Sequence, residues 1–225
     1  MKKEVKIVVP NDWSAVTLKK YLELRKDMAN YEDDKDAVVA CMFHHLCDFP
    51  IEYINGLRYD TYNQIITDLV SFLNKIEYPL EKIIEIDGIE YGFEPNLSQM
   101  AYGAYVDITK YESINIDDSW AEIMSILYRP VTKKIGQLYE IQPYSGNIDK
   151  ERFLNVTMDK HFGAVFFFKS LLMDLSKDTL SSLMDLKEIS PSISTTLERS
   201  GKLIHQLSNL PMVTSNELTK LLKNP

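Results

Sequence analysis

The sequence IIEIDGIEYGFEPNLSQMAYGAYVDITKY, residues 83–111, carries the most informative pattern in this chain. Two short segments with alternating apolar residues meet at Asp87-Gly88, a dipeptide favoured in two-residue turns whose residues both need positive φ. They predict a β-hairpin whose strands carry, at alternate positions, Ile84, Ile86, Ile89 and Tyr91. After Pro95, the spacing of apolar residues predicts a helix over about residues 98–111.

Apolar residues at helical spacing lie on both sides of this hairpin. They predict further helices over about residues 17–28, 35–47, 60–73, 117–128 and 149–186, the last with a break near residue 177. A short segment is expected between Pro50 and Gly56. Alternating apolar residues predict strands over residues 4–9 and 137–143.

Polar residues and prolines set the expected ends of these helices. Asp60 is expected to cap one long helix, and the run from Asp117 to Ser119 with Glu122 has the spacing of a capping box for another. Pro130 is expected to stop that second helix.

Together these elements predict an α+β fold that is predominantly α-helical, with a small antiparallel β-hairpin and an extended C-terminal arm. We expect a mainly helical core domain over residues 1–186, with the hairpin near residues 83–93, and a helical arm over residues 187–225. The sequence around Pro191 separates the two.

The expected arm contains two short amphipathic segments. Their apolar residues are Leu197, Ile204, Leu207, Leu218, Leu221 and Leu222. Because isolated helices shorter than roughly 12–15 residues are marginal in water, these segments need an apolar surface on which to fold. We expect the arm to dock on a neighbouring subunit or a partner protein; docking against the core of its own chain is the alternative.

Acidic residues are concentrated in the first half of the chain, which has a net charge of −8. Residues 1–112 hold 12 basic and 20 acidic side chains, whereas residues 113–225 hold 13 of each. Binding to duplex DNA normally needs a clustered positive surface, so we expect no sequence-specific nucleic-acid partner. The second half is neutral overall, so a local basic face there is the alternative.

Several features predict a protein that folds in a reducing cytoplasm without a membrane. The two cysteines, Cys41 and Cys47, lie in one expected helix and do not make a disulfide scaffold. The residues before Pro10 contain too few apolar side chains for a signal peptide. The most apolar segment, residues 162–175, would form a helix of about 21 Å, shorter than a hydrocarbon core of roughly 30 Å.

The best metal-ligand candidate is Cys41-x-x-His44-His45-x-Cys47. On a helix Cys41 and His45 share a face, but Cys47 lies roughly 240° around the axis from Cys41, so these side chains do not converge on one ion. We expect a half-buried helix in which cysteine acts as a small apolar residue, and no metal.

Motifs for catalysis are also missing from the sequence. It contains no Gly-x-Ser-x-Gly motif and no glycine-rich phosphate loop. The carboxylate pairs Asp33-Asp34 and Asp117-Asp118 fall where helices are expected to start, so capping explains them. We therefore expect no enzyme activity, no catalytic residues and no cofactor.

Aromatic residues provide candidate contact surfaces. Tyr102 and Tyr105 recur at helical spacing, and tyrosine offers a large contact area with a polar end that tolerates water. A tyrosine-lined edge of the core is the alternative. Phe166, Phe167 and Phe168 span roughly 200° of a helix, which would place them either in the centre of the core or between subunits.

Several of these segments together resemble a known group of viral proteins. They are the strand ending in VVP, the VTLKKYLELRK and IMSILYRPV segments, the stretch over residues 84–111, and FGAVFFFKSLL. Over residues 4–175 this order resembles small proteins from the structural gene clusters of tailed bacteriophages that infect Bacteroidota, including crAss-like phages. The resemblance covers a scaffold, so no functional residue carries over from it.

The resemblance implies a noncatalytic virion protein, an oligomeric ring component of the phage neck or tail near the portal, which contributes to assembly and genome passage. Expected partners are further copies of the chain and other phage structural proteins, such as the portal or adjacent tail rings. The expected location is the tail or neck of the virion, after assembly in the host cytoplasm. The alternative is a tail-assembly chaperone that is absent from the mature virion.

Overall fold

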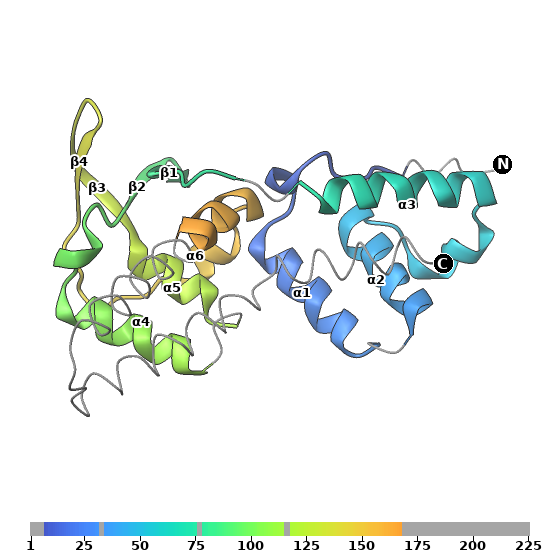
Figure 1. The fold of residues 1–225 in the computed structure, drawn as a ribbon, viewed down its shortest axis with the longest axis horizontal. Helices are drawn as coiled ribbons and strands as arrows, with labels where there is room; N and C mark the ends of the chain where they lie inside the picture. Colours follow the sequence, from blue (N-terminus) through green and yellow to red (C-terminus); the bar gives the residue numbers. More distant parts are fainter. Residues whose placement is uncertain (1–6, 32–33, 76–77, 115–117, 168–225) are drawn as a thin grey trace, which may run out of the picture. The chain divides into compact units, whose positions relative to one another are not determined.

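The computed structural model describes residues 7–31, 34–75, 78–114 and 118–167 (Figure 1). They form an α+β fold that is predominantly helical, as predicted, and the predicted hairpin is part of a four-stranded antiparallel sheet. The chain divides into two compact units. Within the described residues, unit 1 comprises 7–31, 34–75 and 154–159, and unit 2 comprises 78–114, 118–153 and 160–167.

Unit 1 is helical. Its elements are η1 (Trp13–Ala15), α1 (Leu18–Ala29), α2 (Lys35–Cys47), η2 (Ile51–Gly56) and α3 (Tyr59–Leu73). Short polar side chains start two of them: Thr17 accepts a hydrogen bond from the Lys20 amide, and Asp34 accepts one from the Ala37 amide. The largest fully buried side chains include Trp13, Met42, Phe43, Leu69 and Phe72.

A segment distant in sequence completes unit 1. The Leu18 amide donates to Val156 O at 2.9 Å, and the Met158 amide donates to Val16 O at 2.8 Å. These bonds flank an antiparallel bridge between Thr17 and Thr157. Residues 154–159 therefore belong to unit 1, although the residues on either side of them belong to unit 2.

Unit 2 contains a four-stranded antiparallel sheet in the order β1-β2-β3-β4. The strands are β1 (Ile83–Ile86), β2 (Ile89–Phe93), β3 (Tyr128–Ile135) and β4 (Leu138–Ile141). The helices are η3 (Leu97–Gln99), α4 (Tyr102–Ile114), α5 (Trp120–Leu127) and α6 (Lys150–Leu154). Residues 158–167 are also helical, beginning in unit 1 and continuing into unit 2.

The predicted hairpin is confirmed as β1 and β2. Ile86 pairs with Ile89, and the two turn residues Asp87 and Gly88 have φ values of 53° and 76°. Positive φ at both positions matches the two-residue turn that the Asp-Gly sequence predicts. Ile84 and Ile86 are buried, whereas Ile89 is exposed.

The helix before Pro130 ends as expected, but the strand that follows it was not predicted. α5 ends at Leu127 and the chain turns directly into β3, because Tyr128 already has extended dihedrals. Pro130 lies inside β3 opposite Tyr91, and its carbonyl accepts a hydrogen bond from the Gln142 amide at 2.9 Å.

Several expected helix and strand boundaries also differ from the structure. Residues 7–10, the described part of the predicted opening strand, have no regular secondary structure. Asp60 lies in the first turn of α3 and is not its cap, since Arg58 occupies that position. Ser119 precedes α5 but makes no capping hydrogen bond through its side chain. The helix expected from residue 149 is interrupted at residues 155–157.

A buried histidine links three helices of unit 2. The Trp120 indole N–H donates to His161 Nδ1 at 3.0 Å, and His161 Nε2 lies 3.2 Å from Phe153 O. The indole N–H only donates, so Nδ1 accepts and carries no proton. The carbonyl oxygen only accepts, so Nε2 carries the proton, and the ring is neutral. His161 therefore acts as a structural link between α5, α6 and the helix of residues 158–167.

Candidate interaction surfaces

One face of α4 presents the predicted tyrosines to solvent. Tyr102 and Tyr105 are 81% and 59% exposed, and Val106 beside them is also exposed. Positions three and four apart on a helix lie on one face, so these side chains form a continuous surface, which we call the tyrosine face.

Contacts on other sides of α4 hold it in place. Ala104 is fully buried, and the Tyr144 hydroxyl donates a hydrogen bond to Asp107. Burial and this contact raise the pKa of Tyr144, so its hydroxyl stays protonated and continues to donate. The tyrosine face is therefore a fixed surface, because the helix that carries it is anchored elsewhere.

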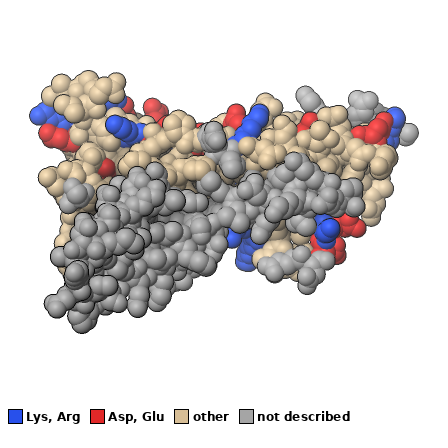
Figure 2. Space-filling view, viewed as in Figure 1, with Lys and Arg blue, Asp and Glu red and all other residues tan. Residues whose placement is uncertain are grey.

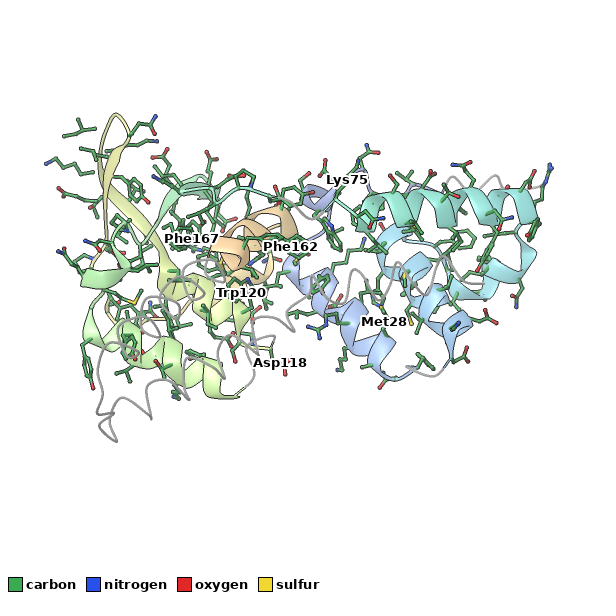
Figure 3. All side chains as sticks on the ribbon, in the orientation of Figure 1. Met28, Lys75, Asp118, Trp120, Phe162 and Phe167 are labelled. Atoms are coloured by element: carbon green, nitrogen blue, oxygen red, sulfur yellow. The ribbon has the colours of Figure 1, made fainter. Side chains whose placement is uncertain are left out.

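The predicted phenylalanines lie at the end of the helix of residues 158–167. Phe166 is half-buried, and the Phe167 ring packs edge-on against Phe93 of β2 with centroids 5.4 Å apart (Figure 3). Phe168 lies outside the described residues, as do the arm residues Leu197, Ile204, Leu207, Leu218, Leu221 and Leu222. Their roles in contacts stay predictions.

The β3–β4 hairpin is an exposed surface; the sequence predicted its second strand, over residues 137–143, but not β3. β3 pairs with β2 only over Tyr128–Pro130; among the described residues, the rest of its backbone pairs with β4 alone. The outer part, residues 131–141, is therefore a two-stranded ribbon, which we call the hairpin arm. Figure 1 shows it extending beyond the helices of its unit.

The tip of the hairpin arm is apolar. Ile135 and Leu138 face each other across the turn at Gly136-Gln137 and are 66% and 78% exposed. Lys133 and Lys134 precede the tip and pair with Glu140 at 3.9 Å and Glu90 at 2.6 Å. In Figure 2 the uncharged end of the arm stands above a band of basic and acidic side chains.

Each unit also contains a groove. The groove in unit 1 has a volume of about 800 Å³ and lies between residues 7–11 and α3, with Ile65 and Phe72 among its lining residues. The groove in unit 2 has a volume of about 530 Å³ and is lined by Phe93, Tyr139 and Phe167 together with Leu138 of the hairpin arm.

The candidate metal ligands of α2 are two buried cysteines and two histidines. Cys41 and Cys47 are buried, and burial raises the pKa of both thiols, that of Cys47 to about 12. His45 contacts Asp27 at 2.7 Å, whereas His44 is exposed. Within the described residues, no three His, Cys, Asp or Glu side chains are grouped so that they could hold a metal ion.

A largely buried ion pair lies where β2 ends beside the start of β3. Arg129 and Glu94 pair through their side chains, which are 11% and 10% exposed. The Tyr139 hydroxyl donates to Phe93 O at 2.8 Å next to this pair. These contacts fix the base of the hairpin arm, so the arm projects from a rigid support.

Among the described helices, none is long and apolar enough to cross a membrane. No protein-family model matches the chain, and no curated protein or solved structure is significantly similar to it.

Proposed function

We propose that this chain is a noncatalytic structural protein of a tailed phage, an oligomeric ring component of the neck or tail near the portal. The order of segments over residues 4–175 supports a phage structural protein. The observation that carries the oligomeric role is the exposed apolar tip of the hairpin arm, which stands on a rigid base. Exposed apolar groups on a rigid support are typical of surfaces that other protein chains cover.

Ring formation requires two different complementary surfaces on each subunit, since a repeated heterologous contact closes a ring when the rotation fits. The chain has candidates for both kinds of surface. The hairpin arm projects, the grooves are concave, and the tyrosine face of α4 offers a third area for a neighbouring protein. Tyrosine is enriched at such interfaces because it combines a large apolar ring with a polar end.

The chemistry of the buried polar groups supports a structural role. Cys47 is held as a thiol, Arg129 pairs with Glu94, and His161 bridges Trp120 and Phe153. Each of these groups is buried or paired within the fold. A net charge of −8 also suits a ring through which DNA passes, because like charge weakens adhesion of the phosphate backbone to the protein.

The experiment is to purify virions on a density gradient and search for the chain by quantitative mass spectrometry, with the major capsid protein as the internal standard. We expect the chain in intact particles at a constant ratio to the portal protein. A chain found in infected-cell lysate but absent from purified particles would refute the ring and favour the tail-assembly chaperone.

A further inference from the structure

The hairpin arm has the properties of a segment that is stabilised by a partner. A two-stranded hairpin alone is marginal in water. Beyond Pro130, within the described residues, the backbone of the arm pairs only between its own two strands, and side-chain contacts of Lys134 and Tyr139 with β2 hold its base. Its apolar tip residues, Ile135 and Leu138, are among the most exposed large apolar side chains of the described protein. A partner that covers these two side chains would remove their apolar surface from water and thereby stabilise the ribbon.

The shape of the tip suits insertion into a groove. The two turn residues are Gly136, with φ 60°, and Gln137, so the tip is no wider than one cross-strand pair. Glycine at the first turn position matches a tight two-residue turn. Lys133 and Lys134 lie just behind the tip and keep a substantial part of their side chains exposed. The tip is therefore a narrow apolar wedge with a basic flank.

The groove in unit 1 offers the complementary features. Its accessible apolar surface comes from residues 7–10, with Val8 59% exposed, and lies over the buried side chains of Ile65 and Phe72. Asp60 and Asp68 also line the groove. Its volume of about 800 Å³ falls within the range of pockets that enclose a ligand, roughly 300–1,000 Å³.

Charge favours a second copy of this chain as the occupant. The groove is lined by two carboxylates and by one ammonium group, that of Lys75, and Asp60 also pairs with Arg58 at 2.7 Å. The described residues of unit 1 carry ten acidic and seven basic side chains, whereas the hairpin arm carries Lys133 and Lys134 against Glu140. The groove in unit 2 is a poorer receptor, because Leu138 of the arm itself already lines it.

We propose that the hairpin arm of one subunit inserts Ile135 and Leu138 into the unit 1 groove of the next subunit, with Lys133 and Lys134 facing Asp60 and Asp68. The contact is heterologous, since the arm and the groove are different surfaces, and its repetition closes a ring. This inference rests on the proposed ring function and names the contact that builds the ring.

The test is cross-linking between two singly substituted full-length chains. One chain carries Leu138→Cys and the other Val8→Cys, so a product containing both chains forms only between molecules. The native cysteines Cys41 and Cys47 are buried, which keeps the background low. In the matched control, the Val8→Cys chain is mixed with an Ile89→Cys chain instead of the Leu138→Cys chain. Ile89→Cys places an exposed thiol at the turn of the other hairpin.

With a short bis-maleimide, the Leu138→Cys and Val8→Cys mixture should give a cross-linked dimer well above that of the control. Asp60→Lys with Asp68→Lys should reduce the cross-linked fraction about tenfold, because two exposed charge pairs change from attraction to repulsion. Lys133→Asp with Lys134→Asp on the other chain should restore it. Circular dichroism confirms that each variant is folded.

A mixed product no stronger than the control, or a product formed only between two Leu138→Cys chains, overturns the proposal. Its failure is distinguishable from failure of the ring function. A chain that is present in virions but does not cross-link in this way would refute the arm-to-groove contact alone, and a chain absent from virions would refute the ring.

Discussion

Replacing Gly163 with alanine should destabilise unit 2, although alanine is the better helix former. Gly163 is buried in the helix of residues 158–167. A Cβ atom there would overlap the carbonyl oxygen of Pro79 and lie 3.0 Å from its carbonyl carbon and 3.3 Å from Leu80 Cα. These are backbone atoms, so no change of rotamer relieves the overlap.

The size of the effect follows from two opposing terms. Overpacking a tightly packed site costs about 1–3 kcal/mol, and the upper end applies because the overlap is with backbone. Alanine recovers about 1 kcal/mol of helix propensity relative to glycine. We expect Gly163→Ala to lower the free energy of unfolding of unit 2 by about 2 kcal/mol.

The assay uses the two tryptophans, since Trp13 lies in unit 1 and Trp120 in unit 2. In a Trp13→Phe background, urea unfolding followed by fluorescence reports on unit 2. With a urea dependence of about 2 kcal/mol per molar, the midpoint should fall by about 1 M. Gly103→Ala is the matched control, because its Cβ would lie 3.6 Å from the Tyr144 ring, an ordinary contact. An unchanged or higher midpoint for Gly163→Ala would refute the close packing of this helix on Pro79.

Three further substitutions test other parts of the fold. Gly88→Val forces a β-branched residue to φ 76° and should cost about 1–3 kcal/mol; an unchanged denaturant midpoint would count against the turn. Burial raises the pKa of Cys47 to about 12 from a reference value of 9.0, so the folded state keeps a proton that the unfolded state releases. Stability should therefore fall as pH rises from about 9 to about 12, with a shallower fall in Cys47→Ala, and an identical pH profile for the two proteins would contradict the assignment. Arg129→Met leaves the largely buried Glu94 carboxylate without its ion partner and should cost about 3 kcal/mol, the lower end for a buried pair. Adding Glu94→Met should recover much of that stability, and no recovery would show that the cost has another origin.

The sequence predicted the elements that depend on local signals. The turn at Asp87-Gly88 formed as expected because its positive φ values are a property of those two residues. The starts of α1 and α2 likewise follow from Thr17 and Asp34, which bond to amides three residues away.

Strand β3 could not be predicted because it depends on distant partners. A Cβ at Gly92 would overlap the side chains of Tyr139 and Ile141, which lie over β2. That packing joins residues almost 50 positions apart. Pro130 correctly marked the end of a helix, but its place within a strand depends on the pairing of β3 with β2.

The candidate surfaces were predictable only in part. Helical spacing placed Tyr102 and Tyr105 on one face, but spacing does not say which face of a helix is buried. Tyr144 lies in a loop more than 35 residues after Asp107, and its hydrogen bond to Asp107 helps to determine which face of α4 is buried. Ile135 and Leu138 carry no sequence signal of exposure, because isoleucine and leucine in strands usually face a core.

The most direct test of the central claim, that this chain is a repeated structural subunit of the phage neck or tail, is its absolute copy number per virion. Mass spectrometry with isotope-labelled standard peptides measures that number against the portal protein. A ring predicts one fixed copy number in every preparation, equal to the number of subunits in a closed ring or a small multiple of it. A copy number that approaches zero as the particles are purified would contradict the account.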